Sequence, residues 1–111
     1  HKEIYYKEDD KVNVNFIGSK VSGEIIELID IKKMNLKNKI VCVENADPGY
    51  DFIFSNNIKG LITKYGGANS HMAIRCHELN IPAAIGVGEE LYNKIKNVKF
   101  ITLDSNSQKI Y

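Results

Sequence analysis

Hydrophobic residues recur at two spacings along the chain, and each spacing predicts a kind of secondary structure. Val12, Val14 and Phe16 alternate with asparagines, a two-residue period that is typical of a half-buried strand. The apolar stretch at residues 21–29 predicts a second strand, whose internal glycine indicates a bulge or the close approach of another segment. The compact run at residues 40–43 predicts a third strand, buried on both faces. We therefore expect mostly β-structure in the first part of the chain.

The remainder alternates between short apolar runs and segments with helical spacing. Residues 31–39, rich in lysine and asparagine, are expected to form an exposed connection, and Asp47-Pro48-Gly49 is a turn signal. The last two predicted strands form a closing hairpin. Strands that alternate with helices in the middle and pair locally at both ends predict a mixed α/β fold. The helices are expected at residues 50–55, 70–79 and 89–96, and the strands at residues 60–63, 83–87, 99–103 and 108–111.

The size and composition are typical of one folded domain. The chain has 111 residues, of which 43% are hydrophobic and 26% charged, and we take residues 1–111 as one domain. The formal net charge of +1 provides no basic excess for nucleic acid, and no apolar run approaches the ~20 residues that span a bilayer. Because the first residue is His1 and not methionine, we expect a domain excised from a longer, multidomain chain. Such a domain would be compact and would bind neither nucleic acid nor membrane.

The cysteines and histidines limit the redox and metal chemistry. Cys42 and Cys76 lie in apolar segments without a CxxC spacing, which predicts reduced thiols in a cytoplasmic protein, with a disulfide between them as the alternative. The histidines are His1, His71 and His77, and no acidic cluster accompanies them in the sequence. We therefore expect no metal site.

A glycine pair followed by a capped helix carries most of the chemistry that the sequence suggests. Gly66 and Gly67 lead into a polar turn in which Asn69 or Ser70 can cap the helix, and His71 then takes the first or second helical position. A helix start carries about half a positive charge and several unpaired N–H donors. A phosphoryl group on the imidazole would lie among those donors, and glycines without a Cβ would let the backbone approach it closely.

His71 is therefore a candidate nucleophile. The positive end of the helix disfavours imidazolium, so the ring is expected to be neutral and nucleophilic. Imidazole suits phosphoryl transfer through a loose transition state, in which alignment and charge neutralisation supply most of the catalysis. Thr63 and Ser70 are candidate hydroxyl donors to the phosphoryl oxygens or to the ring. A histidine after a helix cap is also commonly an ordinary surface residue, so these residues alone leave both interpretations open.

The residues around His71 follow a longer pattern, Thr-x-x-Gly-Gly-x-x-Ser-His-x-Ala-Ile with Ile-Pro-Ala downstream. This pattern resembles the phosphohistidine segment of the phosphoenolpyruvate (PEP)-utilising enzymes, which include pyruvate phosphate dikinase, PEP synthase and the first enzyme of the sugar phosphotransferase system. The resemblance extends over about residues 12–111, and so many fixed spacings make it specific. The matching residues are Thr63, Gly66, Gly67, Ser70, His71, Ala73, Ile74, Glu78, Leu79, Ile81, Pro82 and Ala83.

Some positions depart from the family pattern. Cys76 and His77 stand where the family usually has Ala-Arg, and Arg75 lies two residues before that place, about 200° away around a helix. The role of the family arginine is therefore not assigned to Arg75, and His77 is expected to be a surface or packing residue. Asn69 replaces the threonine of many dikinases. Asn80 replaces a glycine, which asparagine can do because it tolerates the left-handed conformation that ends a helix.

The resemblance implies a swivelling β/β/α domain of three layers, in which His71 is transiently phosphorylated and carries the group to another domain. It also implies an ATP-grasp-like nucleotide-binding domain and an acceptor-substrate domain in the same parent chain. ATP and Mg²⁺ are expected in the parent enzyme, and no cofactor is expected to be bound by this domain. The residues expected to bind or support the phosphoryl group are Thr63, Gly66, Gly67, Asn69 and Ser70.

The end of the motif indicates a branch of the family. Glu-Leu-x-Ile-Pro-Ala resembles the synthase and dikinase branch, so we expect the β-phosphate of ATP as donor, with release of AMP. The acceptor would be pyruvate or another small molecule such as an amide, and the isolated domain would be inactive as an enzyme. One alternative is a carrier fed by PEP, as in enzyme I of the phosphotransferase system. Another alternative is a non-catalytic docking module that kept the fold.

Overall fold

The strands of the domain join into a single mixed sheet. The computed structural model describes residues 3–7, 12–29, 35–45 and 47–111. The helices within these residues are α1 (His71–Leu79), α2 (Glu89–Ile95) and the 3₁₀ helix η1 (Pro48–Ser55). The strands are β1 (Asn15–Ile17), β2 (Val21–Glu27), β3 (Lys39–Val43), β4 (Gly60–Thr63), β5 (Ala83–Ile85), β6 (Phe100–Asp104) and β7 (Lys109–Ile110).

Parallel strands form the centre of the sheet and antiparallel strands its edges. The strand order is β1-β5-β4-β3-β2-β6-β7. The pairs among β2, β3, β4 and β5 are parallel, whereas β1 pairs antiparallel to β5, and β6 pairs antiparallel to β2 and β7. η1 connects β3 to β4, and α1 connects β4 to β5, because parallel neighbours require a crossover. The predicted mixed α/β fold is confirmed.

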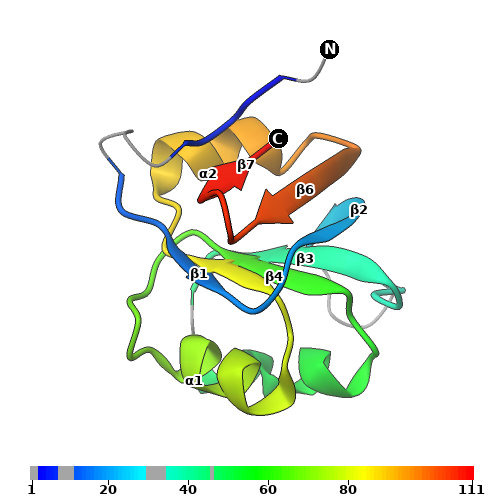
Figure 1. Cartoon of the computed structure of the whole chain (residues 1–111). Helices are drawn as coiled ribbons and strands as arrows, with labels where there is room; N and C mark the ends of the chain where they lie inside the picture. The colour runs from blue at the N-terminus through cyan, green and yellow to red at the C-terminus, as the bar shows by residue number, and fades with distance from the viewer. Residues whose placement is uncertain (1–2, 8–11, 30–34, 46) are drawn as a thin grey trace.

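The sheet curls, so its two ends lie in different layers (Figure 1). In that view β6 and β7 lie above the middle of the sheet, beside α2, and α1 lies below it. η1 packs with α1 on the lower side. The three-layer β/β/α architecture is confirmed, and the two β layers are parts of one hydrogen-bonded sheet.

Apolar side chains fill both spaces between the layers. Along β3, Ile40 and Cys42 contribute to an upper core, whereas Val41 and Val43 contribute to a lower core, so this strand is buried on both faces as predicted. Other members of the upper core are Tyr6, Val14, Ile62, Ala84, Val87, Leu91, Tyr92, Ile95, Ile101, Leu103 and Ile110. Other members of the lower core are Ile17, Leu36, Ile53, Ile58, Leu61, Met72, Ala73, Cys76, Ala83 and Ile85.

The first strand is shorter than predicted. β1 begins only at Asn15, because the backbone before it bonds to a side chain. The Tyr6 hydroxyl donates to the Val12 carbonyl oxygen at 2.8 Å, and the Val14 N–H donates to the same hydroxyl at 3.5 Å. The prediction of a strand over residues 12–14 is therefore wrong. Alternation correctly indicated that Val14 is buried, but it does not show what the backbone bonds to.

Two other strands also end early. β2 ends at Glu27, two residues before the predicted end, and Ile29 beyond it is 79% exposed. β5 ends at Ile85 and not at Val87, because Gly86 has a φ of +74°, outside the strand region. Val87 remains fully buried even though it leaves the strand.

The segments before and after β3 also differ from the prediction. Residues 31–34 of the expected exposed connection lie outside the described residues. Leu36 in the same connection is only 3% exposed and packs in the lower core, so the prediction is wrong there. The turn signal is in fact the start of η1, where the Asp47 carboxylate accepts a hydrogen bond from the Gly49 N–H at 2.7 Å and Pro48 takes the first helical position.

Both cysteines are free thiols, as expected. Cys42 lies in the upper core and Cys76 in the lower core, on opposite faces of the sheet. Burial raises the pKa of each thiol to about 12. Because the thiolate is the reactive form, both thiols are protected chemically as well as sterically.

We expect neither Cys42 nor Cys76 to be alkylated in the folded chain. At pH 8 a thiol with a pKa of about 12 is ionised in roughly one molecule in ten thousand. Iodoacetamide followed by mass spectrometry should label neither cysteine in buffer and both in denaturing guanidinium chloride. Rapid labelling of either cysteine in buffer would contradict the buried positions.

We expect Ile53→Ala to destabilise the domain. Ile53 is fully buried and anchors η1 to the lower core. Removing its side chain should lower the free energy of unfolding by about 2–5 kcal/mol, measured by urea denaturation. Ile29→Ala is the matched control, because Ile29 is 79% exposed and its loss should cost at most about 0.5 kcal/mol. Equal, small effects of both changes would show that η1 is not held by this side chain.

Candidate functional site

Ser70 places His71 at the start of α1. Ser70 is the residue that caps the helix, with extended φ and ψ of −69° and 159°. Its hydroxyl accepts from the Ala73 N–H at 3.4 Å and donates to the Gly67 carbonyl oxygen at 2.8 Å. Of the two predicted caps, Ser70 takes this role, and Asn69 is an exposed turn residue. His71 is consequently the first residue of the helix.

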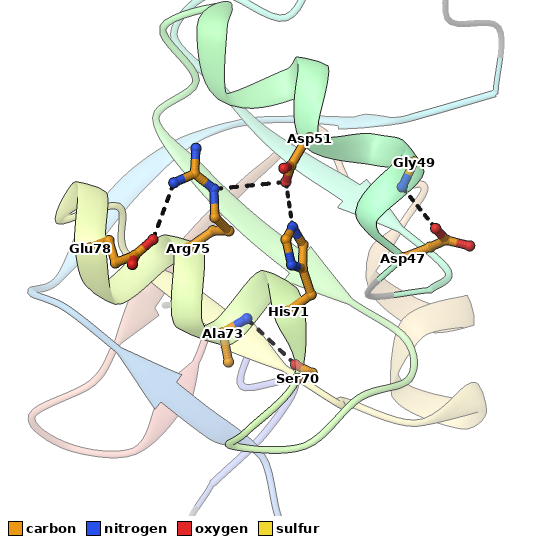
Figure 2. Close-up of polar contacts among 8 residues, drawn as sticks. All are labelled: Asp47, Gly49, Asp51, Ser70, His71, Ala73, Arg75 and Glu78. Atoms are coloured by element: carbon orange, nitrogen blue, oxygen red, sulfur yellow. Dashed lines mark hydrogen bonds and ion pairs between the residues drawn. The ribbon is translucent and has the colours of Figure 1, made fainter.

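The imidazole of His71 bonds to a carboxylate from another element. Figure 2 shows the ring pointing to Asp51, which lies in the first turn of η1. The distance from Nε2 of His71 to Oδ1 of Asp51 is 2.7 Å. A carboxylate only accepts, so Nε2–H donates in this contact, and in the neutral form of the ring the lone pair lies on Nδ1. Both side chains are partly exposed, the His71 side chain at 35% and the Asp51 side chain at 43%.

Arg75 lies beside the same carboxylate. It follows His71 by one helical turn, and its Nε is 3.8 Å from Oδ1 of Asp51 (Figure 2). Its Nη1 donates to Oε1 of Glu78 at 3.1 Å, and its Cζ lies 5.5 Å from the centre of the Phe54 ring. Arg75, to which the sequence assigned no role, therefore lies near the same carboxylate oxygen as His71.

Asp51 is the residue that the sequence analysis missed. It lies twenty residues before His71, in a segment where only a turn and a short helix were predicted. The available signal was Asp47-Pro48-Gly49, which starts a helix and so places Asp51 in its first turn. Only the packing of η1 beside α1 brings this carboxylate to the imidazole.

The two glycines of the loop have different surroundings. Gly66 has a φ of +123°, which side chains rarely adopt. Its carbonyl oxygen also lies 2.2 Å from the place that a Cβ on Gly86 would occupy, so the two glycine backbones are in close contact. Gly67 does not have a positive φ, and a Cβ added to it would meet nothing within 4 Å. The fold therefore requires Gly66 and Gly86, whereas Gly67 faces open space.

Thr63 supports the loop from behind. It is fully buried, and its Oγ1 accepts from the Gly86 N–H at 2.9 Å. Its carbonyl oxygen accepts from the N–H groups of Gly86 and Val87. These contacts hold Gly86 against Gly66, and the expected contact of Thr63 with a phosphoryl group stays a prediction.

Other candidate chemistry is limited in the described part of the chain. His77 is exposed on α1, as expected of a surface residue. The described residues contain no group of three or more His, Cys, Asp or Glu side chains that could hold a metal ion. They also form no helix that is long and apolar enough to cross a membrane.

Several curated proteins are similar in sequence. The chain is 30% identical to a phosphoenolpyruvate-protein phosphotransferase of Buchnera aphidicola over 112 residues, which covers 95% of the chain and 19% of that protein. It is 31% identical to a rifampicin phosphotransferase of Bacillus cereus, covering 74% of the chain and 10% of that protein. It is 34% identical to a phosphoenolpyruvate synthase of Helicobacter pylori, covering 64% of the chain and 9% of that protein. The chain thus spans less than a fifth of these relatives.

Solved structures share the fold. The solution NMR structure of a UPF0107 protein matches with a TM-score of 0.64 at 15% identity, covering 86% of this chain and 92% of that chain. The NMR structure of an enzyme I protein matches with a TM-score of 0.56 at 22% identity, covering 75% of this chain and 33% of that chain. At these identities the likeness shows the fold alone.

The glycine contacts predict unequal effects of alanine substitutions. Gly86→Ala should lower the free energy of unfolding by at least about 2 kcal/mol, because it combines a positive φ with a backbone clash. Gly67→Ala should change it by at most about 0.5 kcal/mol, because the added methyl group has room. Urea denaturation measures both values. A Gly86→Ala chain as stable as the wild type would contradict the close contact with Gly66.

The family comparison includes the site itself. The sequence profile of the family described as "PEP-utilising enzyme, mobile domain" matches residues 35–108, well over half of the chain. This segment contains Asp51, His71 and the loop with Gly66 and Gly67 that joins β4 to α1, which we call the glycine loop. The chain therefore belongs to the family of mobile, phosphohistidine domains of the PEP-utilising enzymes.

Proposed function

We propose that this chain is the phosphoryl-carrier part of a larger phosphotransferase, with His71 as the residue that is transiently phosphorylated. The observation that carries the proposal is the place of His71. It is a partly exposed imidazole at the first position of α1, directly after the glycine loop and within the segment that matches the family. A nucleophile that must meet a donor and then an acceptor has to be accessible in this way.

The surroundings of His71 suit a phosphoryl group. Ser70 satisfies the Ala73 N–H, whereas the described residues provide no acceptor for the N–H groups of His71 and Met72. Unpaired donors and the positive end of the helix stabilise an anion. Gly67 leaves space above the loop, so the phosphoryl oxygens of a donor can approach the backbone closely.

A covalent carrier divides one transfer into two. His71 would take the group in one domain and deliver it in another, while the tether to the parent chain keeps its effective concentration high at both sites. The chain covers only 9–19% of its relatives, so the donor and acceptor sites belong to other domains of the parent. An ATP-grasp-like domain that holds ATP and Mg²⁺ is the donor domain that we propose.

We propose the β-phosphate of ATP as the donor, with release of AMP. This rests on the Glu-Leu-x-Ile-Pro-Ala ending and on the similarity to a phosphoenolpyruvate synthase and a rifampicin phosphotransferase. The second candidate donor is PEP. It is favoured by the match to a phosphoenolpyruvate-protein phosphotransferase, which extends over 95% of the chain. The acceptor would be pyruvate or another small molecule such as an amide.

We expect His71→Ala to abolish labelling of the full-length parent enzyme without unfolding the domain. The enzyme is incubated with ATP labelled at the β-phosphate and, separately, with labelled PEP, and the acid-labile label is located by mass spectrometry. The thermal unfolding midpoint should hardly move, because His71 is a partly exposed residue outside both cores. His77→Ala is the matched control, since His77 is an exposed histidine of the same helix and its loss should leave labelling intact.

Each result has a distinct meaning. Label from ATP with release of AMP supports the ATP-driven parent, and label from PEP alone supports the enzyme I-like carrier. Label that persists in His71→Ala contradicts His71 as the carrier residue. A wild-type enzyme that accepts label from neither donor favours the non-catalytic docking module.

A further inference from the structure

The carboxylate of Asp51 occupies the space in front of the reactive ring. Its Oδ1 is 2.7 Å from Nε2 of His71 and 3.8 Å from Nε of Arg75. It therefore lies between an imidazole N–H and a guanidinium, the surroundings that a phosphoryl oxygen also seeks. Figure 2 shows the three side chains converging from η1 and α1 on one point.

Arg75 has an unused donor that faces this point. Its Nε is buried and has no hydrogen-bond partner among the described residues, because 3.8 Å is beyond hydrogen-bond distance. Oε1 of Glu78 accepts a hydrogen bond from Nη1 of Arg75, and the Phe54 ring lies against the guanidinium. An unpaired buried donor is uncommon in native proteins and costs free energy, so it needs an explanation.

We propose that in the unphosphorylated domain the Asp51 carboxylate occupies the position that the phosphoryl group takes on Nε2 of His71. After phosphorylation, Arg75 binds the phosphoryl group at that position. This inference rests on the proposed function, since it needs His71 to be phosphorylated. In the unphosphorylated domain the carboxylate closes the anion site. In the phosphorylated domain the carboxylate withdraws, and Nε of Arg75 gains the acceptor that it lacks.

The carboxylate and the phosphoryl group cannot occupy this site together. A phosphorus atom bonded to Nε2 would overlap Oδ1 of Asp51, which now lies along the N–H direction of that nitrogen. The negative charges of the two groups would also repel each other at such a distance. The replacement keeps an anion beside Arg75, because one negative group takes the place of the other.

The transfer can be written with its atoms balanced. Asp51 releases His71, and the ring proton moves from Nε2 to Nδ1 by exchange with water. The freed Nε2 lone pair then attacks the phosphorus of the donor, a phosphoanhydride or an enol phosphate. The N–P bond forms while the P–O bond to the leaving group breaks and its electron pair leaves with that oxygen. Nδ1 keeps its proton, and Arg75 donates through Nε to a phosphoryl oxygen.

The first test uses the 111-residue chain and potassium phosphoramidate, which phosphorylates histidine without a donor domain. Arg75 is the only arginine of the sequence, so its Nε–H gives one assignable side-chain signal in ¹⁵N NMR. We expect this signal to shift when His71 is phosphorylated. We also expect the phosphate on Nε2, which ¹⁵N chemical shifts distinguish from Nδ1. An unmoved Nε–H signal, or phosphate on Nδ1, would overturn the inference.

Variants test the two roles separately. Asp51→Asn removes the competing charge and should raise the rate of phosphorylation about three- to tenfold. Glu78→Gln is its matched control, because Glu78 also contacts Arg75 but lies outside the site, and it should change the rate less than twofold. Arg75→Gln should shorten the half-life of the phosphohistidine about three- to tenfold, and Arg75→Lys should restore part of it.

The outcomes separate this inference from the proposed function. Phosphohistidine that forms on His71 at the same rate and decays equally fast in all variants would overturn the roles of Asp51 and Arg75 alone. A wild-type chain and an Asp51→Asn chain that both take no phosphate at His71 would count against the carrier function as well, and the inference would fall with it.

Discussion

The parallel pairing of β3, β4 and β5 is the constraint on which the site depends. Parallel strands place their carboxyl ends at the same edge of the sheet, and Val43 of β3 is in register with Thr63 of β4. The segments that leave this edge are the start of η1 and the glycine loop before α1. Residues from two crossovers therefore meet at one place, as ligand sites commonly do at the carboxyl edge of an open α/β sheet.

Backbone contacts then hold the loop that leads to His71. Gly86 leaves β5 with a positive φ and lies against Gly66, and the hydroxyl and carbonyl oxygens of the buried Thr63 accept three hydrogen bonds from the N–H groups of Gly86 and Val87. Ser70 joins the loop to the helix by bonding to both Gly67 and Ala73. Hydrogen bonds and close backbone contacts thus fix the position of His71, while in our proposal the side chains that face it, Asp51 and Arg75, rearrange on phosphorylation.

In the carrier function that we propose, the domain has to protect its reactive group and still release it to two partners. A partly exposed histidine that bonds to a neighbouring carboxylate meets the first need. While that hydrogen bond persists, Nε2 carries the donated proton and has no free lone pair for attack. Partial exposure meets the second need, since a single contact between partly exposed side chains is weak and easily broken. The curled sheet beneath contributes the stability that the exposed site does not, through cores on both of its faces.

The sequence by itself determined the α/β class, the positions of most elements, a helix cap at Asn69 or Ser70, the left-handed end at Asn80 and the family. These features follow from local periodicity, capping chemistry and fixed motif spacing. The predictions of a strand over residues 12–14 and of an exposed Leu36 were wrong, because periodicity does not report the hydrogen bonds to the Tyr6 hydroxyl or the packing of Leu36 in the lower core. Only the tertiary structure decided that Asp51 and Arg75 meet at His71. Asp51 lies in the connection between β3 and β4, whereas His71 and Arg75 lie in the connection between β4 and β5, and the local sequence does not report which side chains of two separate connections will be in contact.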